Sequence, residues 1–587
     1  MPAYLIKGGT IADGNGGEPY RGDVRILGDR IAQVGADLQP EPDDQVIDAA
    51  GLLVTPGFVD LHTHYDGQIT WDSDLTPSSW HGVTTLIVGN CGVGFAPVRP
   101  GQQDRLIELM EGVEDIPGTA LHEGITWGWE SFGDYLDVLD QRRWTVDVGT
   151  QVPHAAVRAY VMGEEAGAGQ ATAEQIAQMR NIVREGLEAG ALGISTTRMI
   201  AHRSIKQEVV PGTFAPEDEL MALADLLAER GEGVFEVVPR GMDGEVSREA
   251  HAEFDWMERV ATRTGRPVLF SLVQTHTEPE RWRLFLDRSK DALERGVPIR
   301  PVVSCRPTGV VFGLQSTFTP FSTRAAYKAL EHLPLAERVA EMKRPEVRTA
   351  ILAEPNGRYR SEALQYQHEH FANMFKLCEP FEWEPDTSQT MLALAEAAGQ
   401  NVEAYVYDYM LENGGRNLIL FPYTNYCDFT MDTVHDMLSH SSSVFGLSDG
   451  GAHCGIACDA GNTTLALSFW TRDRTKGPKL ALGRVVKMMS RDTAEMYGLK
   501  DRGRIEPGLR ADINLIDYDN LAMALPEMVW DLPTGARRVV QRARGYVATF
   551  VAGVQTIDHD QLTGALPGRL IRGQVVPEEQ APLSVTV

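Results

Sequence analysis

The pattern of hydrophobic and polar positions changes along the chain and predicts two kinds of structure. Near both ends, short segments alternate apolar and polar residues and are separated by Gly and Asp, which is typical of strands joined by tight turns. These segments are YLIKGGTIAD, GDVRILGDRIAQVG and QVIDAAGLLVTPG at one end, and ADINLIDYDN and GYVATFVAGVQTID at the other. We expect the two ends to form one β-sandwich; two unrelated β segments are the alternative.

Between these ends, strand-like apolar runs alternate with amphipathic helices. Apolar residues recur at helical spacing over 172–190 and 216–233. The strand-like runs are GFVDLHTH, TTLIVGNC, DVGTQVPH, ALGISTT, GVFEVVP, RPVLFSLVQ, IRPVVSC and SVFGLSDGG. This alternation predicts an α/β fold with a (β/α)8, TIM-like barrel. The predicted units are 1–54 for the first part of the sandwich, 55–499 for the barrel, and 500–587 for the second part of the sandwich and a tail.

The charge and composition of the chain argue against some classes of binding partner and bear on its localisation. The chain has 587 residues and a formal net charge of −28, which argues against binding to nucleic acid or to anionic membranes. It contains no apolar run of about 18 residues, and its N-terminus lacks the pattern of a secretory signal. The six cysteines form no CxxC motif, which favours reduced thiols. We therefore expect a cytoplasmic protein.

Polar residues at the ends of the predicted strands suggest chemistry. His62 and His64 are two residues apart, so on an extended strand their side chains lie on the same side. Cys91 ends the second predicted strand, and Asp449 ends the eighth, which neighbours the first in a closed barrel. Imidazole, thiolate and carboxylate groups all bind zinc. Each residue alone is ordinary, but together at the barrel mouth they predict a metal site.

A metal at this position would define the chemistry. A bound divalent cation lowers the pKa of water and polarises a carbonyl. A carboxylate beside that water can accept its proton and later deliver it to a leaving nitrogen. Asp449 is the predicted proton shuttle, and a nearby cation is expected to keep its pKa low.

Further polar residues follow the other predicted strands. His154 ends the third and could hydrogen-bond a substrate or an oxyanion, or it could be a buried histidine with satisfied nitrogens. Arg198, Arg240 and Arg306 follow the fourth, fifth and seventh. Any of these arginines could hold a substrate carboxylate, although a solvated or structural role is the alternative for each. We expect His453, several residues beyond Asp449, to be a loop residue that shapes the pocket.

Several motifs also resemble those of a known family. They are TPGFVDLHTHYD, GVTTLIVGNCGVGFAPV, EDIPGTAL before WGWESFGDYLDVLD, GALGIST, FGLSDGGAH, DRGRIEPGLRADINLIDYD and TGALPGRLIRG. This set resembles the N-acyl-D-amino-acid deacylase branch of the amidohydrolase superfamily, nearly from end to end. The resemblance implies a metal-dependent hydrolase that splits the amide bond of an N-acylated D-amino acid. It also places His62, His64, Cys91 and Asp449 at metal or catalytic positions.

The chain departs from this family at two positions. The family holds a zinc ion with the cysteine and with histidines that end strands five and six. Val238 and Leu272 stand where those histidines are expected. Three explanations are open. The first is one metal ion bound by His62, His64 and Asp449, with Cys91 near or bound. The second is a fuller zinc site rebuilt by other residues, among them Glu236, Gln274 and His276. The third is a degenerate site in a protein that is not a hydrolase.

Two other functions compete with amide hydrolysis of an N-acyl amino acid. The same chemistry would serve a cyclic amide, imide or carbamate, whereas a linear N-acyl amino acid needs an Arg or Lys directed at its carboxylate. A non-catalytic relative that kept the barrel is the other alternative. We expect a small-molecule substrate, and the superfamily resemblance also implies a possible homo-oligomer.

Overall fold

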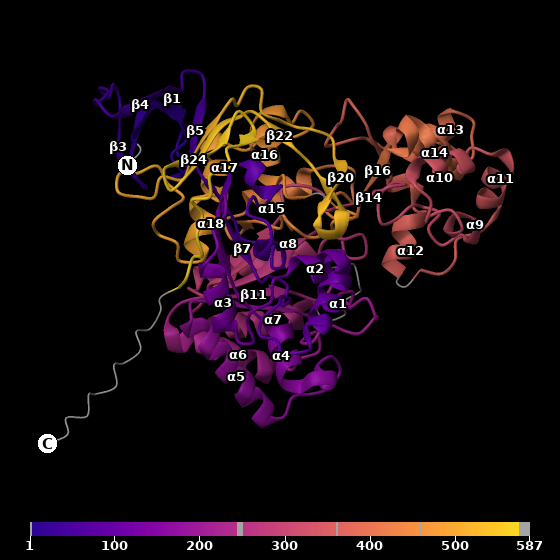
Figure 1. The fold of residues 1–587 in the computed structure, drawn as a ribbon, viewed down its shortest axis with the longest axis horizontal. Helices are drawn as coiled ribbons and strands as arrows, with labels where there is room; N and C mark the ends of the chain where they lie inside the picture. Colours follow the sequence, from indigo (N-terminus) through magenta and orange to yellow (C-terminus); the bar gives the residue numbers. More distant parts are fainter. Residues whose placement is uncertain (1–2, 243–249, 360–361, 458, 574–587) are drawn as a thin grey trace.

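The computed structural model describes residues 3–242, 250–359, 362–457 and 459–573 as an α/β protein (Figure 1). The predicted tail, 578–587, and Cys458 lie outside these residues. Within the described part of the chain, no helix is both long and apolar enough to cross a membrane.

Parallel strands form the centre of the structure, and they correspond to the eight predicted runs. One sheet has the order β6-β7-β8, and a second has the order β17-β13-β12-β11-β10-β9. Only Gln151 separates β8 from β9, so these two strands follow one another along the chain. The bounds are Phe58–Asp60 for β6, Val83–Val88 for β7, Asp147–Thr150 for β8, Val152–Pro153 for β9, Gly193–Thr197 for β10, Val234–Val238 for β11, Val268–Leu272 for β12, Ile299–Val303 for β13 and Val444–Phe445 for β17.

The segments that follow β6 and β17 lie side by side. Thr63 and Gly450 form a parallel bridge. The His64 N–H donates to the Gly450 carbonyl at 2.7 Å, and the Asp449 N–H donates to the His62 carbonyl at 3.2 Å. These backbone contacts bring the histidine pair next to Asp449.

Helices surround the parallel strands. The helix predicted over 172–190 is α5, Ala173–Glu188, and it begins with a capping box in which the Thr172 side chain accepts from the Gln175 N–H. The helix predicted over 216–233 is α6, Glu217–Arg230, and Gly231 in the left-handed conformation ends it. The others in this part are α1 Gln103–Glu114, α2 Gly118–Gly124, α3 Phe132–Asp140, α4 His154–Met162, α7 Ala250–Thr264, α8 Arg281–Glu294, α15 Asp432–Ser439, α16 Asn462–Leu465 with its π-helical continuation Ala466–Asp473, α17 Leu482–Met489 and α18 Arg491–Met496.

Strands from both ends of the chain share one nine-stranded sheet. Its order is β25-β24-β23-β18-β5-β1-β2-β3, and β4 pairs with β1. Its apolar core joins residues such as Ile6 and Ile26 to Ile513 and Phe550. The bounds are β1 Ala3–Ile11, β2 Tyr20–Leu27, β3 Arg30–Gly35, β4 Asp44–Asp48, β5 Leu53–Pro56, β18 Ile513–Ile516, β23 Tyr546–Val551, β24 Val554–Asp558 and β25 Gln561–Leu562. Two small ribbons pair β19 Ala522–Met523 with β22 Ala543–Arg544, and β20 Glu527–Leu532 with β21 Ala536–Val540.

A separate lobe interrupts the segment 55–499, which the sequence analysis treated as one barrel unit. It lies between β13 and β17 along the chain and projects to the right in Figure 1. It has its own apolar core, which includes Phe312, Tyr407 and Phe421. Its elements are β14 Gly309–Phe312, α9 Ala325–Lys328, α10 Leu335–Met342, α11 Pro345–Ala353, α12 Glu362–Glu369, β15 Phe375–Leu377, α13 Met391–Ala397, α14 Val402–Leu411 and β16 Leu418–Pro422.

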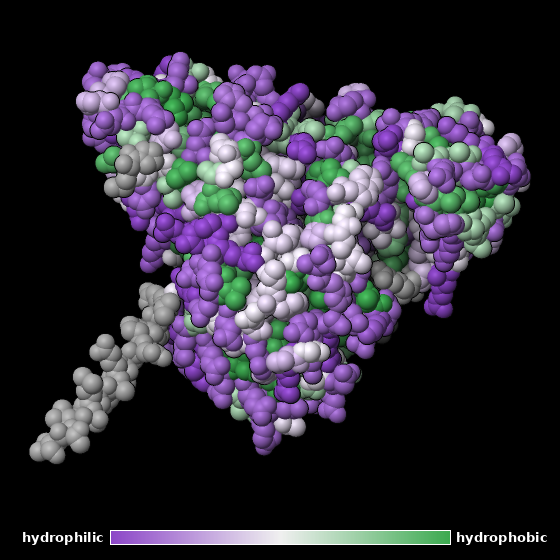
Figure 2. All heavy atoms as spheres, in the orientation of Figure 1, coloured by the Kyte–Doolittle hydropathy of each residue, from purple (hydrophilic) through white to green (hydrophobic). Residues whose placement is uncertain are grey.

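The face of the molecule drawn in Figure 2 is mostly hydrophilic. Figure 2 shows hydrophilic residues over most of this face, with hydrophobic residues in scattered patches. Scattered apolar residues are normal on a soluble surface and mark no particular site.

Candidate metal centre

Three side chains from two strand ends converge on one position. The Cys91 sulfur lies 3.3 Å from His62 Nε2 and 3.6 Å from His64 Nε2. All three residues are buried, and in the described part of the chain they are the one His, Cys, Asp and Glu group close enough to hold a metal ion. The two imidazoles therefore present the same ring nitrogen to the same place.

Asp449, in the segment that follows β17, lies next to this group. Its Oδ1 lies 3.4 Å from His62 Nε2 and 3.9 Å from His64 Nε2. Its side chain is 21% exposed, whereas those of the two histidines are almost fully buried. Asp449 is thus the member of the group that can exchange protons with solvent or meet a substrate.

The backbone around these residues adopts uncommon conformations. Cys91 and Asp449 have φ values of 56° and 47°, in the left-handed region that non-glycine residues seldom occupy. Close packing holds both turns. A Cβ on Gly92 would lie 2.9 Å from the Thr196 Cα, and one on Gly451 would lie 3.0 Å from the His64 carbonyl. The glycines of the GNCG and SDGG motifs therefore let these turns pack against neighbouring strands.

The histidine pair follows β6 rather than forming its last residues. The strand ends at Asp60, and Thr63, between the two histidines, keeps an extended backbone through its bridge to Gly450. The side chains of His62 and His64 thus reach the same position, as the spacing predicted.

Four further carboxyl groups surround the histidines. Glu236 Oε1 lies 3.7 Å from His62 Nδ1, and Glu114 Oε1 lies 3.5 Å from His64 Nδ1. Asp60 accepts a hydrogen bond from the Ser448 hydroxyl at 2.5 Å. Asp66 is 2% exposed, and its Oδ2 has no hydrogen-bond partner among the described residues.

These surroundings raise the pKa of the acids and lower the pKa of the imidazoles. Burial, followed by the charges of Asp459 and Asp60, raises the pKa of Asp449 to about 8. Burial raises the pKa of Glu236 to about 8 as well. Burial, then the charges of Glu114 and Glu236, raises the pKa of the Cys91 thiol well above its usual value. Burial lowers the pKa of His62 to about 3. A cation beside Asp449 Oδ1 would act in the opposite direction on that carboxyl and on the thiol.

This donor set fits a divalent cation. Neutral imidazole nitrogens, a thiolate and a carboxylate are zinc ligands, and burying ionised acids without counter-charges is costly unless a cation compensates them. Among the described residues, the Nδ1 atoms of His62 and His64 have no hydrogen-bond partner, and neither do the Oε1 atoms of Glu236 and Glu114. Each histidine thus has a carboxylate near its Nδ1 without a hydrogen bond to it. This is consistent with a site in which these hydrogen bonds form when an ion binds.

The two positions that depart from the family pattern are apolar and buried. Val238 is 4% exposed and Leu272 is 1% exposed, and both pack in the core cluster that contains Cys91. Of the proposed replacements, Glu236 lies beside Cys91 and His62. Gln274 instead bonds Asp428, and His276 packs against Tyr366.

Two further histidines lie near the site: His202, which was not predicted for it, and His453, which was expected to shape the pocket. The charges of His202 and His453 both act on His62 and His64. His202 accepts or donates a hydrogen bond with the Thr197 hydroxyl at 3.0 Å, and His453 Nε2 lies 3.7 Å from Glu114 Oε2. His202 lies in a loop beyond the fourth strand, where no periodicity could indicate it, and His453 was expected only to shape the pocket.

The predicted substrate-binding residues have different surroundings. Both nitrogens of His154 are engaged, one with the Thr196 hydroxyl and one with Glu219, each at 2.9 Å. These contacts favour the alternative of a satisfied buried histidine. Burial raises the pKa of Glu219, but hydrogen bonds and positive charge from His154 and Arg158 outweigh it and lower that pKa to about 2.

The three arginines differ in whether their side chains already pair with a carboxylate. Arg198 pairs with Glu253 at 3.0 Å, and Arg306 pairs with Asp459 at 3.1 Å. Arg240 lies with its guanidinium over the Phe214 ring, and its Nε has no hydrogen-bond partner among the described residues.

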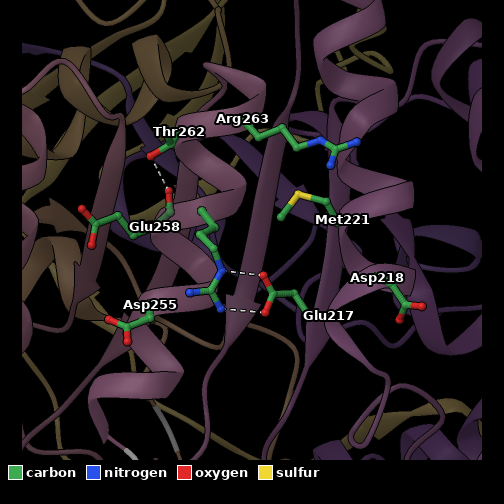
Figure 3. A pocket seen from close by; sticks show the side chains of 8 residues that line it. Glu217, Asp218, Met221, Asp255, Glu258, Thr262 and Arg263 are labelled. Carbon is green, nitrogen blue, oxygen red and sulfur yellow. Dashed lines mark hydrogen bonds and ion pairs between the residues drawn. The ribbon is translucent and has the colours of Figure 1, made fainter.

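A surface groove of about 730 Å³ lies between α6 and α7, away from these groups. Figure 3 shows that mostly charged side chains line it, among them Glu217 and Arg263. Arg259 donates two hydrogen bonds to Glu217. Exposed pairs of this kind are typical of a solvated helix face, so we assign the groove no role.

Comparison with known proteins agrees with this arrangement. The sequence profile of the Amidohydrolase family matches residues 45–557. The chain belongs to the amidohydrolase family. The predicted resemblance is therefore confirmed at the level of the family.

Two relatives of this amidohydrolase come from Alcaligenes xylosoxydans xylosoxydans. D-aminoacylase is 36% identical over 35% of this chain and 40% of its own length. N-acyl-D-aspartate deacylase is 32% identical over 40% of this chain and 42% of its own length. The matched segments thus span about two fifths of the length of these relatives.

A solved structure shares the fold of this amidohydrolase. N-acyl-D-glutamate deacylase from Bordetella bronchiseptica, solved with zinc and a phosphonate inhibitor, superposes with a TM-score of 0.64 at 22% identity. The match covers 97% of this chain and 99% of that chain.

Proposed function

We propose that this amidohydrolase is a metal-dependent enzyme that hydrolyses the amide bond of an N-acyl amino acid or a similar small acylated amine. The observation that carries the proposal is the convergence of His62, His64, Cys91 and Asp449 on one position. The relatives named D-aminoacylase and N-acyl-D-aspartate deacylase support this substrate class.

We infer that a single divalent cation, with zinc as the favoured metal, is held by His62, His64, Cys91 and Asp449. When bound, such a cation polarises the substrate carbonyl and makes water more acidic. A single ion is favoured because Val238 and Leu272 fill the positions where further ligands are expected. The zinc reported for the related deacylase is consistent with the metal that we propose.

Asp449 is the proposed general base and acid. Its Oδ1 accepts the proton of the attacking water and later returns it to the leaving amine. The Asp449 side chain is 21% exposed, so its carboxylate can meet a substrate. The buried imidazoles hold their positions through this exchange because each lies between a carboxylate on one side and the shared position on the other.

Arg240 is the proposed anchor for a substrate carboxylate. Arg198 and Arg306 have buried carboxylate partners, whereas the Arg240 Nε has none among the described residues. Arg240 follows β11, the strand on which Glu236 faces Cys91, so its side chain emerges at the same end of the strand as the candidate metal centre. A guanidinium can bind a carboxylate with two parallel hydrogen bonds.

The architecture expected for such an enzyme completes the proposal. We infer that the eight parallel strand positions form a closed barrel, with the contacts between residues 62–64 and 449–450 completing the ring. We also infer that the nine-stranded sheet belongs to a β-sandwich made from 1–54 and from the part of 500–587 that precedes the tail.

A substrate panel tests the function. The purified protein is assayed on N-acyl D- and L-amino acids, on cyclic amides and on acylated amines without a carboxylate, with added zinc, manganese or cobalt. We expect turnover of linear N-acyl amino acids that a chelator abolishes and a metal restores. Turnover of cyclic amides alone, or no chelator-sensitive turnover, would contradict the proposal.

A further inference from the structure

Two glutamates lie next to the candidate histidine ligands, each near the Nδ1 atom of one histidine. Glu236 lies on β11, and Glu114 is the last residue of α1. Both are 2% exposed. Each points its Oε1 at the Nδ1 of one histidine, 3.7 Å for Glu236 and His62 and 3.5 Å for Glu114 and His64.

The opposite ring nitrogens point the other way. His62 Nε2 and His64 Nε2 both face the Cys91 sulfur and Asp449 Oδ1. Each imidazole thus lies between a carboxylate at Nδ1 and the shared position at Nε2. A neutral imidazole carries its proton on one nitrogen, so a carboxylate that accepts from Nδ1–H leaves Nε2 free to bind a cation.

Each glutamate also contacts the loop that carries another ligand. Glu236 Oε2 accepts from the Cys91 N–H at 3.0 Å, in the turn where Cys91 has a φ of 56°. The Glu114 carbonyl accepts from the N–H of His453, and its Oε2 lies 3.7 Å from His453 Nε2, four residues beyond Asp449. Glu236 therefore joins His62 to the Cys91 turn, and Glu114 joins His64 to the loop after Asp449.

We propose that Glu114 and Glu236 are paired positioning residues that hold His64 and His62 in the Nδ1–H form and lock the loops of the two remaining ligands. This inference rests on the proposed metal centre and deepens it. In the part of the chain that the structure describes, both Oε1 atoms and both Nδ1 atoms lack hydrogen-bond partners. The two distances exceed the usual hydrogen-bond range of about 2.7–3.2 Å, so small movements would form both bonds.

The test measures zinc affinity rather than activity alone. The dissociation constant for zinc is determined by competition with a chromophoric chelator for the wild type, Glu114→Gln, Glu236→Gln and the double variant. We expect each single variant to bind zinc about tenfold to hundredfold more weakly, which is the usual effect of losing such a partner. The double variant should bind zinc more weakly than either single variant, because the glutamates contact different imidazoles.

Controls separate this inference from a loss of structure. Glu253→Gln also removes a buried carboxylate, but one that pairs with Arg198, and it should leave zinc affinity unchanged. The metal-free unfolding temperature reports whether each variant folds. If a Gln variant does not fold, Glu→Asp at the same position keeps the charge but withdraws it by one methylene, and weaker zinc binding by that variant decides the question.

The outcomes distinguish the two proposals. If the wild type binds zinc in a His62-dependent way but Glu114→Gln and Glu236→Gln bind it equally well, the positioning role is wrong and the metal centre stands. If the wild type binds no zinc, or binds it regardless of His62→Ala, the proposed metal centre itself is wrong.

Discussion

At the scale of single residues, the candidate site depends on how a few polar groups are buried together. His62 and His64 are almost fully buried in a region that also holds five carboxyl groups. Burying so many acids without counter-charges is costly, and a cation among them would remove much of that cost. The buried acids that destabilise the metal-free protein are therefore suited to binding an ion.

His62→Ala tests the ligand set. We expect the variant to lose bound zinc and more than about hundredfold of its amide hydrolysis, because removing a ligand should cost more than removing the partner behind it. Metal analysis and turnover of the preferred N-acyl amino acid measure both effects, and circular dichroism checks the fold. Unchanged activity with an intact fold would contradict the assignment of His62 as a metal ligand.

Arg240→Ala tests the substrate anchor. Loss of a charge-assisted contact of about 1.5–3 kcal/mol should raise KM for N-acyl amino acids about tenfold to hundredfold with little change in kcat. An acylated amine without a carboxylate serves as the control substrate and should be hydrolysed as before. Arg240→Lys should recover only part of the loss, since lysine cannot form the paired bonds. Equal effects on both substrates would show that Arg240 does not bind the substrate carboxylate.

At the scale of elements, the sequence predicted the types and order of the elements better than their ends. The runs GFVDLHTH and SVFGLSDGG were predicted as strands, but the regular strands β6 and β17 have only three and two residues. β17 leaves the sheet early because the backbone turns into the site, where Leu447 and Asp449 have positive φ values. After β6, only the isolated bridge between Thr63 and Gly450 continues the pairing. Strand propensity cannot indicate such turns, since they depend on packing against another strand.

Gly451→Ala tests this packing. Gly451 has a φ of 92°, and an added Cβ would lie 3.0 Å from the His64 backbone. We expect a loss of stability well above about 1 kcal/mol, together with weaker zinc binding, because both the conformation and the contact are strained. Urea unfolding and zinc titration measure these effects.

Gly508→Ala is the matched control. Gly508 has nearly the same φ, 90°, but nothing lies within 4 Å of the added Cβ. This variant should carry the conformational cost of about 1 kcal/mol alone and retain zinc binding. Equal behaviour of the two variants would mean that the close approach to His64 has no importance.

At the scale of the whole molecule, buried ion pairs connect the parallel strands to the C-terminal segment. Asp147, on β8, pairs with Arg502 at 2.7 Å and with Arg510 at 2.9 Å. Arg510 also pairs with Asp512, just before β18 of the nine-stranded sheet. This network joins segments more than 350 residues apart, so no local pattern could predict it.

Asp147→Asn tests the connection. Asp147 is 2% exposed, and its removal leaves two arginines with fewer partners in a buried place. We expect a loss of roughly 3–5 kcal/mol in the free energy of unfolding. Glu217→Gln, which breaks the exposed pair with Arg259 seen in Figure 3, is the control and should cost at most about 1 kcal/mol. Similar losses for both variants would contradict the importance of the buried network.

The sequence by itself determined the alternation of strands and helices, the apolar strands and the residues at their ends, because periodicity and turn residues are local properties. It also placed His62 and His64 on one side of an extended segment. Only the tertiary structure decided that Glu114 and His202 lie with them, that Arg198 and Arg306 have carboxylate partners while the Arg240 Nε has none among the described residues, and that residues between β13 and β17 form a lobe with its own core. The physical reason is that burial and the sharing of charge depend on contacts between distant segments, which a one-dimensional pattern does not contain.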